Sequence, residues 1–305
     1  RMTTYTFDNK IGWRAKKNFK FFRSSTVYAH WNYYNPEGFP TTKENFKNST
    51  NTLKPSIALI GDSFVEGYYL PYEQTFANLL DDNYEGKQVI NLGISGFSPD
   101  QYLMYSRLHL KKYNVKDIIV VFFPGNDING TYQSEYQGFA KPYFEIGAVS
   151  PSNLPLVKKG GLEQKNEKNF KTLIRQSAVY TSLRPFIKNF KKPPFKATVY
   201  DREKMLKPLK LIGTIAAENP KSNFFVYYIP RYENYINPQI YKTNINTYKQ
   251  ICDELNIRCE DVTEIFAEHN DAGIFYIPND GHFSSMGSSL IANHLYQLLY
   301  TQNRN

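Results

Sequence analysis

The stretch from residue 56 to residue 67 reads SIALIGDSFVEG. Its first half, Ile57 to Ile60, is a short apolar run closed by Gly61, a pattern typical of a strand buried inside a sheet. The residues after this glycine predict a turn from the strand into a helix, with Ser63 at the turn. A strand, a polar turn and a helix in direct succession indicate the start of a βαβ unit.

The same pattern recurs along the chain. We expect further strands at residues 89–92, 118–123, 224–229 and 257–262, helices at 76–80 and 102–113, and a last helix that begins at Ser284 or Ser285. The sequence therefore predicts an α/β fold with a mainly parallel sheet and helices on both faces. In such sheets ligands bind beyond the carboxyl ends of the strands, so the residues just after each strand are candidates for a site.

Two segments lie outside this regular pattern. Residues 1–55 are polar and aromatic with little periodicity, and we expect them to form an extended arm that packs on a core domain of residues 56–305. About a hundred residues separate the third and fourth strands, more than a crossover helix needs, so we interpret residues 130–215 as an insertion and a candidate lid. Within it, residues 142–157 alternate around Gly147 and suggest a hairpin.

The composition is that of an ordinary globular protein. Of the 305 residues, 41% are hydrophobic and 21% are charged, which excludes a disordered or fibrous chain. No apolar run reaches the roughly 18 residues of a membrane span. The chain begins at Arg1, so we expect that it has been processed, and we favour an extracytoplasmic location, periplasmic or secreted.

The net charge of +9 is unevenly distributed. Residues 158–210 hold 15 Lys or Arg against 4 Asp or Glu, which gives this segment +11 and the rest of the chain −2. That distribution disfavours a nucleic-acid-binding protein that is basic throughout. The segment is either solvated surface produced by biased composition or a contact for an anionic polymer or membrane surface, with Lys188, Lys191, Lys192 and Lys196 as its candidate residues.

The two cysteines, Cys252 and Cys259, cannot form a disulfide framework, and their spacing is not CxxC. They could form one bridge in an oxidising compartment, but we favour two buried free thiols.

Four polar sets follow the predicted strands or precede the last helix: Gly61-Asp62-Ser63, Asn91 to Gly96, Gly125-Asn126-Asp127 and Asp280-Gly281-His282. A serine hydroxyl is a weak nucleophile, and it needs a histidine base that a carboxylate orients. Ser63, His282 and Asp280 are the candidates for these three roles. The oxyanion that forms during acyl transfer needs fixed donors, for which we expect the backbone N–H groups of Ser63 and Gly96 and the side-chain amide of Asn126.

Rival interpretations of these motifs fail. The segment from Gly61 to Gly67 lacks the Lys-Ser/Thr ending of a phosphate-binding loop. Gly93 to Gly96 is neither GxGxxG nor GxSxG, which weakens Ser95 as an alternative nucleophile. We expect Asp62 and Asp127 to hold the site loops through backbone N–H groups, and His30, His109, His269 and His294 to be structural or surface residues. His269, Asp271 and Asp280 match no metal motif.

The four sets together resemble the marker blocks of the SGNH (GDSL-type) hydrolases, which carry Gly-Asp-Ser, a glycine, an asparagine and a histidine in that order. The resemblance covers residues 56–130 closely and 220–300 more loosely. Residues 12–14 and 35–39 also look like the lead-in of larger bacterial members.

The fourth block departs from the commonest family pattern. Only Gly281 separates Asp280 from His282, whereas two intervening residues are commoner in the family. The shorter spacing occurs in members that resemble polysaccharide O-acetyl esterases and transferases. It leaves open whether Asp280 or a backbone carbonyl orients the histidine.

This resemblance implies a three-layer, flavodoxin-like α/β/α fold, no metal or cofactor, and a serine ester hydrolase or O-acyltransferase that forms an acyl-enzyme. Substrates of such proteins range from lipids and thioesters to acetylated glycans, so the family does not choose one. Our leading hypothesis is a small acyl ester, above all an acetyl ester, of a small molecule or glycan. The alternatives are a lipase or thioesterase for longer acyl chains, with the insertion as a lid, and a carbohydrate-binding protein that keeps the fold without turnover.

Overall fold

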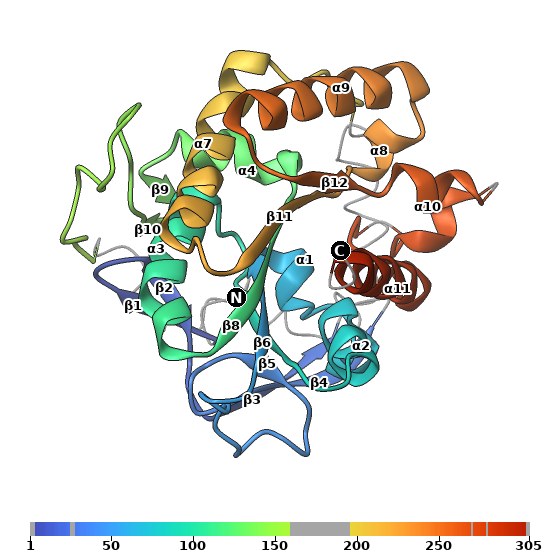
Figure 1. Ribbon diagram of the computed structural model, residues 1–305. Coiled ribbons are helices and arrows are strands. Elements are labelled where there is room, and N and C mark those ends of the chain that lie inside the picture. The colour runs from blue at the N-terminus through green and yellow to red at the C-terminus, as the bar shows by residue number, and fades with distance from the viewer. Residues whose placement is uncertain (1–3, 25–27, 159–195, 270, 279, 303–305) are drawn as a thin grey trace, which may run out of the picture.

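The computed structural model describes residues 4–24, 28–158, 196–269, 271–278 and 280–302, and its centre is a parallel sheet (Figure 1). The sheet consists of β6 (Ser56–Gly61), β7 (Gln88–Gly93), β8 (Val115–Phe122), β11 (Asn223–Tyr228) and β12 (Cys259–Asp261). Their order across the sheet is β12-β11-β8-β6-β7, and every neighbouring pair is parallel. Read from β7 to β12 and numbered by their order along the chain, the five strands run 2-1-3-4-5. This is the arrangement of flavodoxin-like folds, and it confirms the predicted class.

Helices cover both faces of the sheet, and they form two cores (Figure 1). Ala58 and Ile60 of β6 pack with one set of helices, and Ile57 and Leu59 pack with the other. All six residues of β6 are buried, as expected for a strand covered on both sides. The first set is α3 (Pro99–His109), α7 (Arg202–Glu218) and α9 (Pro238–Leu255), and the second is α2 (Phe76–Asn83), α10 (Thr263–Ala267) and α11 (Ser285–Gln302).

Short helices lie between these elements: α1 (Ser63–Glu66), α4 (Pro124–Thr131), α8 (Tyr232–Tyr235) and the 3₁₀ turns η1 (Tyr72–Gln74), η2 (Leu110–Lys112) and η3 (Ala272–Phe275). The predicted strands agree with the observed ones to within a few residues. The cap of α11 is Ser284, because its Oγ accepts a hydrogen bond from the Gly287 N–H at 3.2 Å.

The N-terminal segment is more regular than the extended arm that we expected. β1 (Tyr5–Asp8) and β2 (Gly12–Ala15) form a hairpin, and β3 (Phe19–Ser24), β4 (Ala29–Tyr34) and β5 (Pro40–Thr41) form an antiparallel sheet. Trp13 of β2 is buried in the core beside α3. Along β4 the side chains of His30, Asn32 and Tyr34 are buried and that of Trp31 is exposed, so one face of this sheet packs inward.

The prediction of a hairpin at residues 142–157 is wrong, because no strand forms there. The Asn153 side chain accepts a hydrogen bond from the Tyr143 N–H and donates one to the Lys141 carbonyl, and these bonds replace a strand ladder. A short hairpin lies earlier, between β9 (Glu135–Tyr136) and β10 (Phe139–Ala140).

Only part of the segment between β8 and β11 belongs to the described residues. Its last portion is α7, a crossover helix in the core beside α3. Lys196 is exposed, whereas Lys188, Lys191 and Lys192 lie outside the described residues.

The preference for free thiols was also wrong, because Cys252 and Cys259 form a disulfide. Asn256 ends α9 in the left-handed conformation, with φ of 51°, and reverses the chain so that β12 returns past the end of this helix. The turn therefore brings two cysteines seven residues apart into contact. In the described ranges no helix is both long and apolar enough to span a bilayer.

Candidate active site

Ser63 is the first residue of α1, directly after the carboxyl end of β6. The Asp62 side chain caps this helix, because its Oδ1 accepts a hydrogen bond from the Phe64 N–H at 2.9 Å. Gly67 ends the helix in the left-handed conformation, with φ of +71°. A Cβ at Gly67 would also lie 2.4 Å from the Thr75 side chain, so only glycine fits. These two caps fix a single helical turn that presents the Ser63 hydroxyl.

His282 reaches Ser63 from the loop that precedes α11. Its Nε2 lies 2.8 Å from the Ser63 Oγ, and its Nδ1 lies 2.5 Å from the Asp280 Oδ1. The carboxylate of Asp280, rather than a backbone carbonyl, is therefore the partner of this ring. Burial alone would raise the pKa of Asp280, but the hydrogen bonds and charge of His282 outweigh burial and lower it below the ordinary value.

Three aromatic rings surround the imidazole of His282. Tyr69 stacks on it with a centroid distance of 4.3 Å, and Phe64 and Tyr68 lie at 4.8 and 5.6 Å. The rings of Phe64, Tyr68 and Tyr69 are buried, so they hold the imidazole in one orientation. No sequence motif marks these three residues, although they follow Ser63 closely.

The two remaining oxyanion candidates follow β7 and β8. Gly96 has φ of +79°, and a Cβ there would lie 2.5 Å from the Tyr136 ring, so both conformation and space require glycine. Asn126 lies in the first turn of α4, and its Nδ2 donates to the Phe97 carbonyl at a long 3.3 Å. Gly96 and Asn126 line a common cavity of about 280 Å³.

Two buried aspartates support these loops. Asp127 accepts hydrogen bonds from the Phe123 N–H at 2.9 Å and from the Tyr102 hydroxyl at 2.8 Å. Asp62 binds the Phe64 N–H, which confirms that both aspartates hold backbone N–H groups of the site loops. Burial raises the pKa of Asp62 to about 6, although the Phe64 N–H and the nearby His282 and Asn126 side chains oppose the rise.

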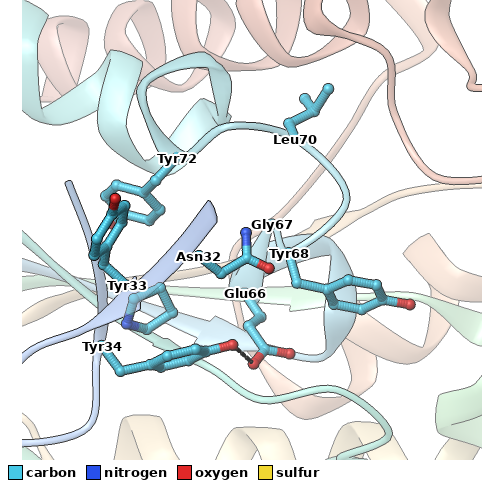
Figure 2. A pocket seen from close by; sticks show the side chains of 9 residues that line it. Asn32, Tyr33, Tyr34, Glu66, Gly67, Tyr68, Leu70 and Tyr72 are labelled. Atoms are coloured by element: carbon cyan, nitrogen blue, oxygen red, sulfur yellow. Dashed lines mark hydrogen bonds between the residues drawn. The ribbon is translucent and has the colours of Figure 1, made fainter. Parts of the chain in front are cut away.

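A third buried carboxylate, Glu66, links α1 to the N-terminal segment (Figure 2). It accepts hydrogen bonds from the hydroxyl groups of Tyr5 and Tyr34, both at 2.7 Å, and from the Ser95 N–H at 2.8 Å. The Ser95 hydroxyl also donates to Glu66. This network was missed, because Tyr5 and Tyr34 are 61 and 32 residues away in sequence and no local motif marks them.

The other histidines have partners away from Ser63. His30 lies 3.1 Å from the Tyr68 carbonyl, His294 lies 2.8 Å from the Tyr227 hydroxyl, and His269 packs on Phe275. His109 packs on Phe39 and Tyr105, and its buried Nδ1 has no hydrogen-bond partner in the described structure. The described residues also contain no group of three or more His, Cys, Asp or Glu placed to hold a metal ion.

The chain is similar to one protein family and to several solved structures. The chain matches the model of the GDSL-like lipase/acylhydrolase family over residues 59–290, whereas no curated protein matches it. Among solved structures, a lipase/acylhydrolase from Enterococcus faecalis is 14% identical, with 81% of this chain and 96% of that chain covered and a TM-score of 0.45. The psychrotrophic esterase EstA from Pseudoalteromonas sp. is 15% identical, with 82% and 99% covered and a TM-score of 0.44.

A two-domain esterase active on acetylated mannans is 13% identical, with 83% of this chain and 51% of that chain covered and a TM-score of 0.46. These three likenesses, all with TM-scores below 0.5, carry no argument about this chain. The family model, by contrast, spans most of the chain and includes Ser63 and His282. The protein is therefore a member of the GDSL-like lipase/acylhydrolase family, as the four marker blocks predicted.

Proposed function

We propose that the protein is a serine-dependent ester hydrolase that removes small acyl groups, acetyl above all, through an acyl-enzyme. The observation that carries the proposal is the continuous contact from the Ser63 Oγ through His282 to the Asp280 carboxylate. A hydroxyl bound to a histidine whose other nitrogen contacts a carboxylate is the arrangement that activates serine as a nucleophile.

In the first half of the reaction, the Ser63 Oγ forms a bond to the ester carbonyl carbon while its proton passes to the His282 Nε2. The carbonyl oxygen gains the negative charge of the tetrahedral intermediate. When the intermediate collapses, the bond to the alcohol oxygen breaks, and the proton on His282 passes to that oxygen. Asp280 keeps the Nδ1 side of the ring protonated and oriented, and its carboxylate offsets the positive charge that forms on the imidazole.

In the second half, a water oxygen forms a bond to the acyl carbon while one of its protons passes to the His282 Nε2. The bond between this carbon and the Ser63 Oγ then breaks, the proton on His282 passes to the Ser63 oxygen, and the carboxylic acid leaves. An acceptor hydroxyl in place of water would give acyl transfer by the same steps. We assign stabilisation of the oxyanion to the N–H groups of Ser63 and Gly96 and to the Asn126 amide. The long contact from Asn126 to the Phe97 carbonyl supports this assignment, because a weak bond can be exchanged for a stronger one to an anion.

The Cys252–Cys259 disulfide supports a further proposal, that the protein acts in an oxidising, extracytoplasmic compartment. Contact of the basic segment with an anionic polymer or membrane stays a prediction of the charge pattern. The substrate that we propose is an acylated small molecule or glycan.

Hydrolysis of p-nitrophenyl acetate tests the proposed function. We expect the wild type and Ser289→Ala, which removes an exposed helical serine, to release p-nitrophenol, and Ser63→Ala to lose activity by several orders of magnitude. A fluorophosphonate should label one serine, and mass spectrometry of the labelled peptide should locate it at Ser63. Full activity of Ser63→Ala, or a label on Ser95 instead, would contradict the proposal.

A further inference from the structure

Arg23 lies one aromatic ring away from the candidate base. Its guanidinium carbon stacks 3.8 Å from the centroid of the Tyr68 ring, and the same ring contacts the imidazole of His282, with the two centroids 5.6 Å apart. The charge of Arg23 also acts on Asp280. Burial would raise the pKa of this carboxylate, the bonds and charge of His282 lower it, and the charge of Arg23 adds to the lowering. A fixed positive charge therefore lies beside the candidate triad.

The N-terminal sheet places Arg23 in this position. Side chains alternate along β3, so that Arg23 on one face is partly buried while Lys20 on the other face is exposed. Arg23 pairs with His30 of β4, and the His30 Nε2 lies 3.1 Å from the Tyr68 carbonyl. Two cross-strand neighbours thus contact Tyr68, one at its ring and one at its backbone, and they hold this end of the sheet against the active site.

The guanidinium of Arg23 has no partner among the described residues. No hydrogen bond or ion pair joins it to any of them, and its buried Nε lacks an acceptor there. Because the residue as a whole is only half-buried, the Nη end is the part that reaches solvent. Glu66 and Asp280 interact with Arg23 electrostatically, but their hydrogen bonds are to other residues. Buried polar groups are normally paired, so this unpaired cation beside an active site suits a ligand from outside the chain.

The proposed mechanism determines which part of an ester lies near Arg23. The carbonyl oxygen must face the N–H of Gly96 and the amide of Asn126, whereas the alcohol oxygen must face the His282 Nε2, which protonates it. The alcohol part of the substrate therefore lies on the imidazole side of the site, where Tyr68 and Arg23 are. A substituent on that alcohol can extend to the Nη end of the guanidinium.

We infer that Arg23 binds a carboxylate on the alcohol part of the substrate, and that the enzyme prefers esters of hydroxy acids, acidic sugars among them, to esters of neutral alcohols. The inference rests on the proposed function and names the class of alcohol that is released. The two Nη groups of a guanidinium can donate parallel hydrogen bonds to both oxygens of a carboxylate, and a neutral alcohol offers no such partner. Stacking on Tyr68 orients the guanidinium in advance, which reduces the entropy lost on binding.

Two matched pairs of aryl acetates test the inference: 4-acetoxybenzoate with 4-acetoxybenzamide, and 3-acetoxybenzoate with 3-acetoxybenzamide. Each pair shares the acetyl group and differs in the charge of the leaving phenol, and the two ring positions vary where the carboxylate lies. The acid-to-amide ratio of kcat/KM is measured for the wild type, Arg23→Gln, Arg23→Lys and Lys20→Gln. Lys20 is the matched control, because it is a cation on the opposite face of the same strand.

We expect Arg23→Gln to lower this ratio roughly 10-fold for at least one pair, because a hydrogen bond to a charged group is lost. Arg23→Lys should lose less, since it keeps the charge but not the fork of donors, and Lys20→Gln should keep the wild-type ratio. Each ratio is taken within one enzyme, so the intrinsic reactivity of the esters and the fraction of folded protein cancel between variants.

An unchanged ratio for both pairs in Arg23→Gln overturns the inference, and so does an equal loss in Lys20→Gln. Arg23 would then serve the fold or the position of Tyr68 and not the choice of substrate. Either result leaves the proposed function intact, provided that the wild type cleaves these acetates and Ser63→Ala does not. Failure of the wild type to cleave p-nitrophenyl acetate or to accept a fluorophosphonate overturns the proposed function itself.

Discussion

The backbone N–H of Ser95 donates to the Glu66 Oε2 at 2.8 Å, and this bond ties the residue before Gly96 to the helix that begins with Ser63. Glu66 is the last residue of that four-residue helix, and it also binds Tyr5 of β1 and Tyr34 of β4. The Glu66 carboxylate therefore joins three parts of the chain: the helix of the candidate nucleophile, the loop of one candidate oxyanion donor and the N-terminal segment. Glu66 touches neither reacting atom, so its proposed role is positioning.

Replacement of this carboxylate should affect turnover more than substrate binding. Glu66→Gln keeps the size of the side chain but replaces one of the two carboxylate oxygens by an NH₂ group, which cannot accept a hydrogen bond. The donors that now share both oxygens then have one acceptor, so the loop from Ser95 to Gly96 should shift. Because small misplacement of groups at a reacting centre can cost about 100-fold, we expect kcat to fall roughly 10- to 100-fold with little change in KM. Steady-state kinetics on p-nitrophenyl acetate measure both constants.

The control is the tyrosine pair. Tyr5→Phe and Tyr34→Phe remove one donor each and leave the bond from Ser95 to Glu66 intact. We expect these variants to lose stability, by about 1 kcal/mol each, while kcat changes less than in Glu66→Gln. If Glu66→Gln lowers the melting temperature but retains wild-type kcat, the carboxylate is only structural.

A separate test concerns the other oxyanion candidate. Asn126→Ala removes the side-chain amide and leaves the backbone of α4 in place. Loss of one oxyanion donor lowers kcat by about 10²–10³, and we expect this loss with a modest effect on KM. A rise in KM at constant kcat would instead mean that Asn126 binds the substrate equally in the ground state and the transition state.

The parts of the fold that were predictable from sequence are those set by local pattern. The apolar run from Ile57 to Ile60 forms β6 because a strand covered on both faces must be apolar throughout, and the other parallel strands follow the same rule. The hairpin expected around Gly147 failed because alternation of polarity does not specify which backbone groups pair. There the Asn153 side chain supplies the hydrogen bonds that a partner strand would have made.

The candidate site likewise has residues that were predictable from sequence and residues that were not. Ser63, Gly96 and Asn126 follow strands of a parallel sheet, so sequence position alone places them at one edge. The Glu66 network and the rings on His282 depend on contacts that tertiary packing creates. Tyr5 and Tyr34 belong to the segment with the least periodicity, and only the folded structure brings them to a carboxylate on α1.

The contact between Asp280 and His282 predicts a large effect on catalysis from a small chemical change. Asp280→Asn keeps the size of the side chain but removes the negative charge, and its amide can favour the wrong tautomer of the imidazole. In the serine triad this change lowers kcat by about 10⁴, and we expect a loss of that order here, measured as kcat on p-nitrophenyl acetate. Near-normal kcat in Asp280→Asn would show that the carboxylate is not needed to orient His282.

The buried carboxyl group of Asp62 predicts a pH-dependent stability. Burial raises its pKa to about 6 in the folded protein, above the ordinary value of 3.8, so the folded state binds this proton more tightly than the unfolded state. The unfolded chain therefore loses the proton first as the pH rises from about 4 to 6, and the folded state is destabilised over that window. Above pH 6 the loss is complete, at roughly 3 kcal/mol for a shift of this size.

Asp62→Asn removes the ionisation and retains an oxygen that can accept the Phe64 N–H. Its free energy of unfolding, relative to the wild type, should therefore increase by about 2–3 kcal/mol between pH 4 and pH 8, measured by urea denaturation at both values. Asp253→Asn, at an exposed position on α9, is the matched control and should show no such increase. If Asp62→Asn differs from the wild type by the same amount at pH 4 and pH 8, the carboxyl group of Asp62 does not titrate in this window, and burial does not control its ionisation.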